Sequence, residues 1–64
     1  MKNEGQILRP KLLKANDVAQ ILNISKAFAY QLMQIGDIPT VKIRGARRVR
    51  PEDLDRYVQE NIAR

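Results

Sequence analysis

Two short apolar stripes, separated by only a few residues, most constrain what this 64-residue chain can fold into. In the first stripe the apolar residues recur at i, i+3, i+4 and i+7, which is the spacing of one buried helix face. Its members are Ala15, Val18, Ala19 and Leu22. The second stripe repeats this spacing at Ala29, Leu32 and Met33. The sequence therefore predicts two short helices, each with one buried face.

The residues between the stripes favour a tight turn. Asn23 tolerates the left-handed conformation that ends a helix, Ile24 can point inward, and Ser25 can accept a hydrogen bond from a free amide of the next helix. Gly36 stands where a second helix of about ten residues is expected to stop. Because a turn of about three to four residues makes the helices cross steeply, the pattern is a helix-turn-helix, whose second helix can enter a DNA major groove.

After Gly36 the sequence predicts a short hairpin. Residues 38–43 end in four residues that alternate polar and apolar, as in a half-buried strand. We expect Arg44-Gly45-Ala46 to form the turn and residues 47–50 to return as the second strand. The apolar residues of the hairpin, Val41, Ile43 and Val49, are expected to face the helices.

A last helix is expected from Pro51 onward. Pro51 suits a first helical turn, and Glu52 and Asp53 lie near its positive end. The expected buried stripe is Leu54, Tyr57, Val58 and Ile62. The predicted fold class is thus α+β and mainly α: a small winged helix-turn-helix with three helices and a two-stranded β-hairpin wing.

The domain organisation follows from the same patterns. Residues 1–11 show no period and contain Gly5 and Pro10, so we expect a flexible N-terminal arm there. Residues 12–64 are expected to form the winged helix-turn-helix domain. No apolar run is long enough for a signal peptide or a membrane span, so we expect a cytoplasmic, nucleoid-associated protein that has no membrane partner.

Composition argues against catalysis. A chain this short buries only about 60% of the surface that its unfolded form exposes, so a roomy catalytic cavity is not expected. The chain has no His and no Cys, which removes the usual zinc ligands and thiol nucleophiles, and its single Ser is expected to cap a helix. We therefore expect no enzyme activity, no metal and no cofactor.

The charge is segregated along the chain. Residues 1–50 hold ten Lys or Arg and three Asp or Glu, whereas residues 51–64 hold two basic and four acidic residues. A basic body with an acidic terminal helix suits a polyanion on one side only. Small soluble domains also carry such charge for solubility, so the charge alone does not establish that the partner is a nucleic acid.

From Leu12 to Val58 the chain resembles the helix-turn-helix domain of the excisionase family, itself related to the winged domains of MerR-type regulators. The chain departs from the family pattern at three positions. Lys14 stands where the family usually has a Thr or Ser cap, Phe28 stands where a small polar residue is more usual, and Arg47 stands where an aromatic residue is common. The segments that carry the resemblance are Leu12–Ser25, Ala29–Met33 with Gly36–Pro39, and Val41–Gly45 with Arg48–Leu54.

The exposed face of the second helix carries the candidate base contacts. Lys26 and Ala27 lie at the N-terminal end that reaches base edges, and Gln31 can pair with adenine. Phe28 is expected to be at least partly in the core, with a thymine methyl or sugar contact as the alternative. Tyr30 is expected to bond a phosphate or to pack against the wing. The candidate residues of this helix are Ser25, Lys26, Ala27, Phe28, Tyr30 and Gln31.

The wing is the stronger electrostatic feature, because residues 42–50 hold five cations and no acid. Such a hairpin can follow the DNA backbone or place an arginine in a narrow minor groove. Arg48 matches the recurrent wing arginine of the family and ranks first. The alternative is a charged edge that discourages strand pairing. The candidate wing residues are Lys42, Arg44, Arg47 and Arg48, and Arg50 is the fifth cation.

The resemblance implies a sequence-specific, double-stranded DNA-binding protein. Excisionases bind beside the ends of a mobile element, bend the DNA and assist an integrase or recombinase, so that role is expected here. One alternative is a small transcriptional regulator with the same domain. Another is a protein-binding accessory subunit whose acidic last helix docks a partner. No heptad run predicts a dimer, so we expect a monomer, with cooperative binding along DNA left open.

Overall fold

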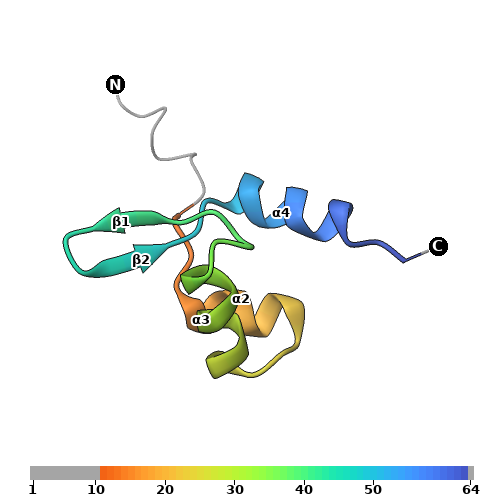
Figure 1. Ribbon diagram of the computed structural model, residues 1–64, viewed down its shortest axis with the longest axis horizontal. Helices are drawn as coiled ribbons and strands as arrows, with labels where there is room; N and C mark the ends of the chain where they lie inside the picture. The colour runs from red at the N-terminus through yellow and green to blue at the C-terminus, as the bar shows by residue number, and fades with distance from the viewer. Residues whose placement is uncertain (1–10, 64) are drawn as a thin grey trace.

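The computed structural model describes residues 11–63, arranged as shown in Figure 1. α2 (Ala15–Leu22) and α3 (Lys26–Gln34) form a helical pair, β1 (Val41–Ile43) and β2 (Ala46–Arg48) form an antiparallel hairpin, and α4 (Pro51–Glu60) follows. The hairpin extends from the helices on the side opposite to the C-terminal end of α4 (Figure 1). The predicted α+β class is confirmed. The predicted arm, residues 1–11, falls outside the described residues apart from Lys11.

The turn between α2 and α3 is built as the sequence predicts. Asn23 is left-handed, with φ at 58°, and this reversal lets the amide of Ile24 donate to the carbonyl of Ala19 at 2.9 Å. The Ser25 hydroxyl then accepts a hydrogen bond from the amide of Phe28 at 3.0 Å. The side-chain cap and the left-handed residue together fix how α3 leaves α2.

Gly36 ends α3 as expected. Its φ of 89° lies in the left-handed region, where glycine carries no steric penalty. The reversal lets the amide of Ile38 donate to the carbonyl of Leu32 at 3.2 Å, and the Ile38 side chain is fully buried. The end of α3 is therefore pinned to the core just before the hairpin begins.

One small core joins all three helices. Val49 is completely buried in it, and its amide and carbonyl both pair with those of Leu13 at 2.8 Å. This bridge ties the segment before α2 to the end of the hairpin. The buried apolar residues are Val18, Ala19, Ala29, Leu32, Met33, Ile38, Val49 and Leu54.

The hairpin boundaries differ from the prediction. The turn has two residues, Arg44 and Gly45, so Ala46 pairs with Ile43 and belongs to β2. Arg44, rather than the glycine after it, has the positive φ, at 58°. β2 ends at Arg48, since Val49 turns to pair with Leu13.

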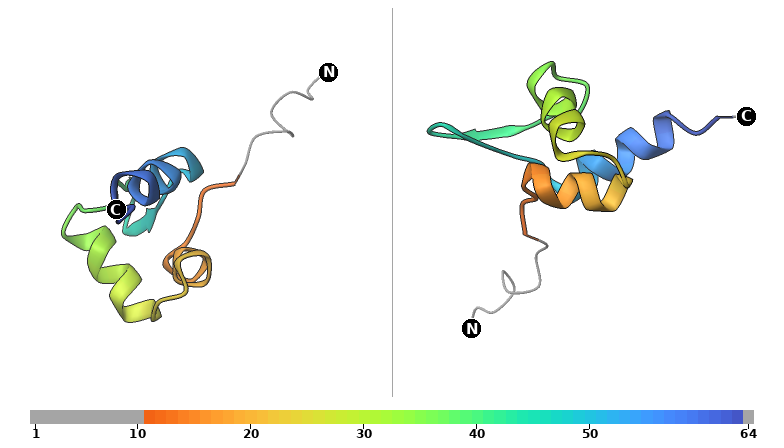
Figure 2. Two further views of the ribbon diagram at one scale, coloured as in Figure 1. Left: turned by 90° about the vertical axis from the view of Figure 1, so that its right-hand side faces the viewer. Right: turned by 90° about the horizontal axis from the view of Figure 1, so that it is seen from below.

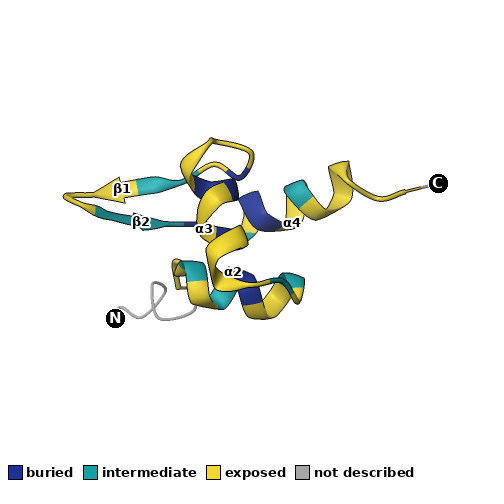
Figure 3. Cartoon of the chain, turned by 60° about the horizontal axis from the view of Figure 1, so that its bottom comes forward, coloured by how far each residue is buried: buried dark blue, intermediate teal, exposed yellow. Residues whose placement is uncertain are grey.

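Several residues predicted to be buried are exposed instead. Figure 3 shows that the buried residues gather where the helices meet the base of the hairpin, whereas the hairpin tip and the end of α4 are open. The hairpin tip and the end of α4 project beyond the body, so nothing in the described chain covers their apolar side chains, and Phe28 lies at the edge of the exposed face of α3. The incorrect predictions, with exposed fractions, are Phe28 at 49%, Ile43 at 52%, Val58 at 38% and Ile62 at 55%.

Candidate nucleic-acid interface

The exposed face of α3 carries both polar and apolar side chains. Ala29, Leu32 and Met33 turn inward to the core, which leaves the remaining side chains of the helix outside. Every candidate residue predicted on this helix is exposed. They are Ser25, Lys26, Ala27, Phe28, Tyr30 and Gln31.

Phe28 is the one candidate in α3 whose environment was predicted incorrectly. It lies four residues before buried Leu32, yet half of its surface is open. Helical geometry puts Phe28 and Tyr30 on opposite flanks of the exposed face, with Ala27 and Gln31 between them. The aromatic rings therefore border a strip of small and polar side chains.

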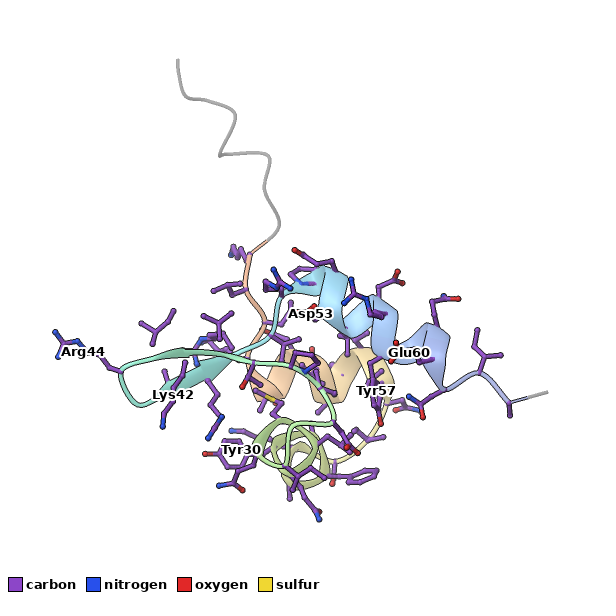
Figure 4. The ribbon with its side chains drawn as sticks, turned by 45° about the horizontal axis from the view of Figure 1, so that its top comes forward. Tyr30, Lys42, Arg44, Asp53, Tyr57 and Glu60 are labelled. Atoms are coloured by element: carbon purple, nitrogen blue, oxygen red, sulfur yellow. The ribbon has the colours of Figure 1, made fainter. Side chains whose placement is uncertain are left out.

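Strand register divides the wing cations between two faces. Lys42 is directly opposite Arg47, and Val41 is opposite Arg48. Because directly opposed residues share a face and side chains alternate along a strand, Lys42 and Arg47 lie on one face and Arg48 on the other. In Figure 4, Lys42 points to the side on which α3 and Tyr30 lie, and Arg44 projects from the hairpin tip.

This arrangement corrects the predicted orientation of the hairpin. We expected Val41, Ile43 and Val49 to face the helices. Val49 is buried in the core as predicted and Val41 is partly buried, but half of Ile43 is exposed and Lys42 points to the side of α3. A two-residue turn sets the register, and a shift by one residue would move every side chain to the other face. The face on the side of α3 is therefore cationic.

Like charges directly opposite each other on a sheet destabilise it. Lys42 and Arg47 are such a pair, and neither forms an ion pair with another described residue. Arg47 Nη1 donates to Thr40 Oγ1 at 3.3 Å, while Arg48 Nη1 donates to the carbonyl oxygen of Arg47 at 2.9 Å. These neutral contacts orient the guanidinium groups and leave their charge uncompensated, which suits an external anion.

Arg50, the fifth cation of the segment, has a different role. Its Nε donates to Asp53 Oδ2 at 2.6 Å and its Nη2 donates to Asp53 Oδ1 at 2.9 Å, a two-pronged pair. The hydrogen bond from Arg50 lowers the pKa of Asp53 below its ordinary 3.8, although burial opposes this. The same contact raises the pKa of Arg50.

Asp53 is only 4% exposed, so its carboxylate is a buried anchor at the start of α4. Its predicted place near the positive end of the last helix is confirmed, whereas its pair with Arg50 was not predicted. The order Arg-Pro-Glu-Asp indicates the pair, because residues three apart at the start of a helix lie on the same side of it. Arg50 thus holds the junction between hairpin and helix.

Within residues 11–63, no three His, Cys, Asp or Glu side chains are grouped so that they could hold a metal ion. None of the helices in this range is both long and apolar enough to cross a lipid bilayer.

The steeply turned helix pair, the exposed polar face of α3 and the cationic hairpin define a DNA-binding helix-turn-helix protein. A comparison with the models of protein families matches residues 12–62 to the helix-turn-helix domain. This match spans most of the chain, so the chain belongs to that family. Comparisons with curated proteins and with solved structures gave no match.

Proposed function

We propose that the protein grips duplex DNA with α3 and the β1–β2 hairpin together. The observation that carries the proposal is that Lys42 of β1 points to the side on which Tyr30 of α3 lies (Figure 4). Both residues belong to elements fixed on one core, through the Ser25 cap and the Leu13–Val49 bridge. A duplex on this side can contact both elements without rearrangement of the chain.

In this proposal α3 lies in the major groove. Lys26 reaches guanine, Gln31 forms a two-pronged pair with adenine, and Ala27 meets a thymine methyl. Phe28 adds a second apolar contact at one border of the strip. Ser25 and the free amides of the first turn hold a phosphate at the positive helix end, and the Tyr30 hydroxyl bonds another.

The hairpin supplies most of the affinity. Lys42 and Arg47 hold one phosphate between them, which relieves their mutual repulsion. Arg44, at the tip, enters the adjacent minor groove. Arg48, on the other hairpin face, contacts the neighbouring backbone with its guanidinium steadied by the carbonyl oxygen of Arg47.

We further propose that this DNA binding serves recombination, in an excisionase-like domain spanning residues 12–64. The support is the resemblance of residues 12–58 to excisionases and to the related winged domains of MerR-type regulators. Contacts in two adjacent grooves can offset a bending cost on the order of a few kcal/mol. The bent complex then helps an integrase of the same mobile element to favour excision.

A recombination assay with this protein, that integrase and DNA carrying the element ends tests the proposed role. We expect the protein to increase the excised product, and to retard DNA most when its site lies mid-fragment, as bending requires. If recombination is unchanged while transcription from an adjacent promoter responds to the protein, the excision role is wrong and the protein is a regulator.

A further inference from the structure

A second surface, separate from the proposed DNA interface, lies between α2 and α4. It is an open, mainly apolar groove of about 570 Å³. Ile21 of α2 and Val58 of α4 form part of its walls, yet they are 58% and 38% exposed. Leu22 and Leu54 continue these walls toward the core. Aliphatic side chains on two neighbouring helices are therefore left without a covering partner in the described chain.

The groove is directed away from the proposed DNA surface. In the left view of Figure 2, α2 and α4 are seen nearly end-on with α3 to one side of both. The exposed face of α3 is opposite to Ala29, Leu32 and Met33, which pack into the shared core. A segment bound between α2 and α4 would therefore leave the exposed face of α3 free.

The charge of α4 limits what can occupy the groove. Asp55 lines it, whereas Glu52 lies 3.8 Å from Arg50 Nη1 and buried Asp53 also pairs with Arg50. Asp55 is therefore the carboxylate that an occupant of the groove would meet. Its charge repels a phosphate backbone, and a second copy placed symmetrically would bring a second Asp55 to the same groove. A Lys or Arg of an occupant would instead be attracted to Asp55.

We propose that this groove docks an amphipathic helix of a partner protein. The helix presents aliphatic residues at i, i+3 or i+4 and i+7 to Ile21, Leu54 and Val58, and flanks them with a Lys or Arg facing Asp55. A groove between two helices suits a helical ligand, whose apolar side chains fill it along one stripe. The chain then connects DNA on one side with a second protein on the other.

Selection from a random peptide library, displayed on phage and applied to the full chain, tests this docking surface. We expect the enriched peptides to share aliphatic residues at helical spacing with flanking Lys or Arg. The double variant Ile21→Gln/Val58→Gln should lose about tenfold or more in affinity for them, as truncation of a central apolar contact does. Asp55→Asn should weaken binding most at low salt.

The matched control is Ile35→Gln, which changes an aliphatic residue of similar exposure just after α3, away from the groove. It should leave peptide binding unchanged, and circular dichroism should show native helix content in every variant. Duplex binding of the groove variants is measured separately and should equal that of the wild type. Failure of the DNA proposal is thus distinguishable from failure of this one.

Three results would overturn the proposal. The first is that no peptide is enriched, or that the enriched peptides are acidic. The second is that they bind the groove double variant as well as they bind Ile35→Gln. The third is that sedimentation shows a dimer of the wild-type chain that Ile21→Gln/Val58→Gln abolishes, because the occupant is then a second copy.

Discussion

Arg44 occupies a conformation that few side chains adopt. Its φ of 58° is left-handed, which costs a residue with a Cβ roughly 1–2 kcal/mol relative to the right-handed region. Glycine or asparagine would form this turn more easily. The presence of an arginine at the tip is explained if its charge is used outside the protein.

Arg44→Asn separates these two effects. We expect the free energy of unfolding to stay the same or to rise by up to about 1 kcal/mol, because asparagine tolerates the left-handed region. Duplex binding should weaken, and the slope of log K against log salt should become shallower by about one. Urea unfolding and fluorescence anisotropy measure the two quantities. A destabilised variant that binds DNA normally would contradict the role given to Arg44.

Ser25 can be tested for two roles with two substitutions. Ser25→Ala removes the cap from the amide of Phe28 and should lower the free energy of unfolding by about 1 kcal/mol. Ser25→Asp keeps a capping oxygen, so stability should be retained, while its negative charge repels a phosphate at the helix end. If Ser25→Asp binds duplex DNA as tightly as the wild type, no phosphate lies there.

At the scale of elements, the register of the hairpin decides which cations act together. Lys42 and Arg47 are paired across the strands, whereas Arg48 lies on the other face. The sequence prediction favoured Arg48, because it matches the recurrent wing arginine of the excisionase family. The structure favours the Lys42–Arg47 pair as the anion site on the side of α3.

The double variant Lys42→Gln/Arg47→Gln tests this pair. If about four to six phosphates are neutralised by the wild type, its salt slope is about −4 to −5. We expect the slope of the double variant to be shallower by about one, because the pair holds one phosphate, and the hairpin to be no less stable because a repulsive pair is gone. Arg56→Gln, an exposed cation on α4, is the control and should leave the slope unchanged. Equal slopes for the double variant and the wild type would exclude the pair.

α4 begins at an ion pair whose contribution depends on pH. The folded state lowers the pKa of Asp53, so this carboxylate stabilises the fold above its unfolded pKa and loses that effect as pH falls through the folded value. Asp53→Asn should therefore be destabilising at neutral pH, and the difference from the wild type should shrink in acid below the ordinary value of 3.8. Urea unfolding across this range measures it. A constant difference would contradict the ion-pair account.

The sequence predicted local structure well, because the relevant interactions are local. Asn23, Ser25 and Gly36 act through backbone conformation and nearby amides, and each behaves as expected. Contacts between residues far apart in the sequence were harder to predict. Val49 pairs with Leu13 instead of continuing the strand, and this contact spans the chain.

The spacing of apolar residues also predicted more buried side chains than the structure has. Ile43 and Ile62 have the spacing of buried residues, but spacing cannot show whether another element reaches far enough to cover them. The spacing of three residues between Arg50 and Asp53 is sufficient to predict their ion pair. It was not predicted, because Arg50 was counted among the cations of the wing. Apart from Phe28, which was expected to be partly in the core, the candidate α3 residues lie on an exposed face as predicted, and their DNA contacts remain predictions.

At the scale of the whole molecule, two surfaces are separated by one small core. The exposed face of α3 and the Lys42–Arg47 face of the hairpin share one side, and the groove between α2 and α4 opens elsewhere. The charge follows this division, since the acids concentrate on α4. If both proposals hold, the chain binds DNA and a second protein on separate surfaces at the same time.

The most direct test is an NMR titration of the isotopically labelled full chain with duplex DNA that carries its binding site. The account predicts that amides of residues 25–31 and of the β1–β2 hairpin shift together at the same DNA ratio, while those around Ile21 and Val58 stay in place. If only one of the two elements responds, or if the groove residues shift instead, α3 and the hairpin do not form a single DNA-binding surface.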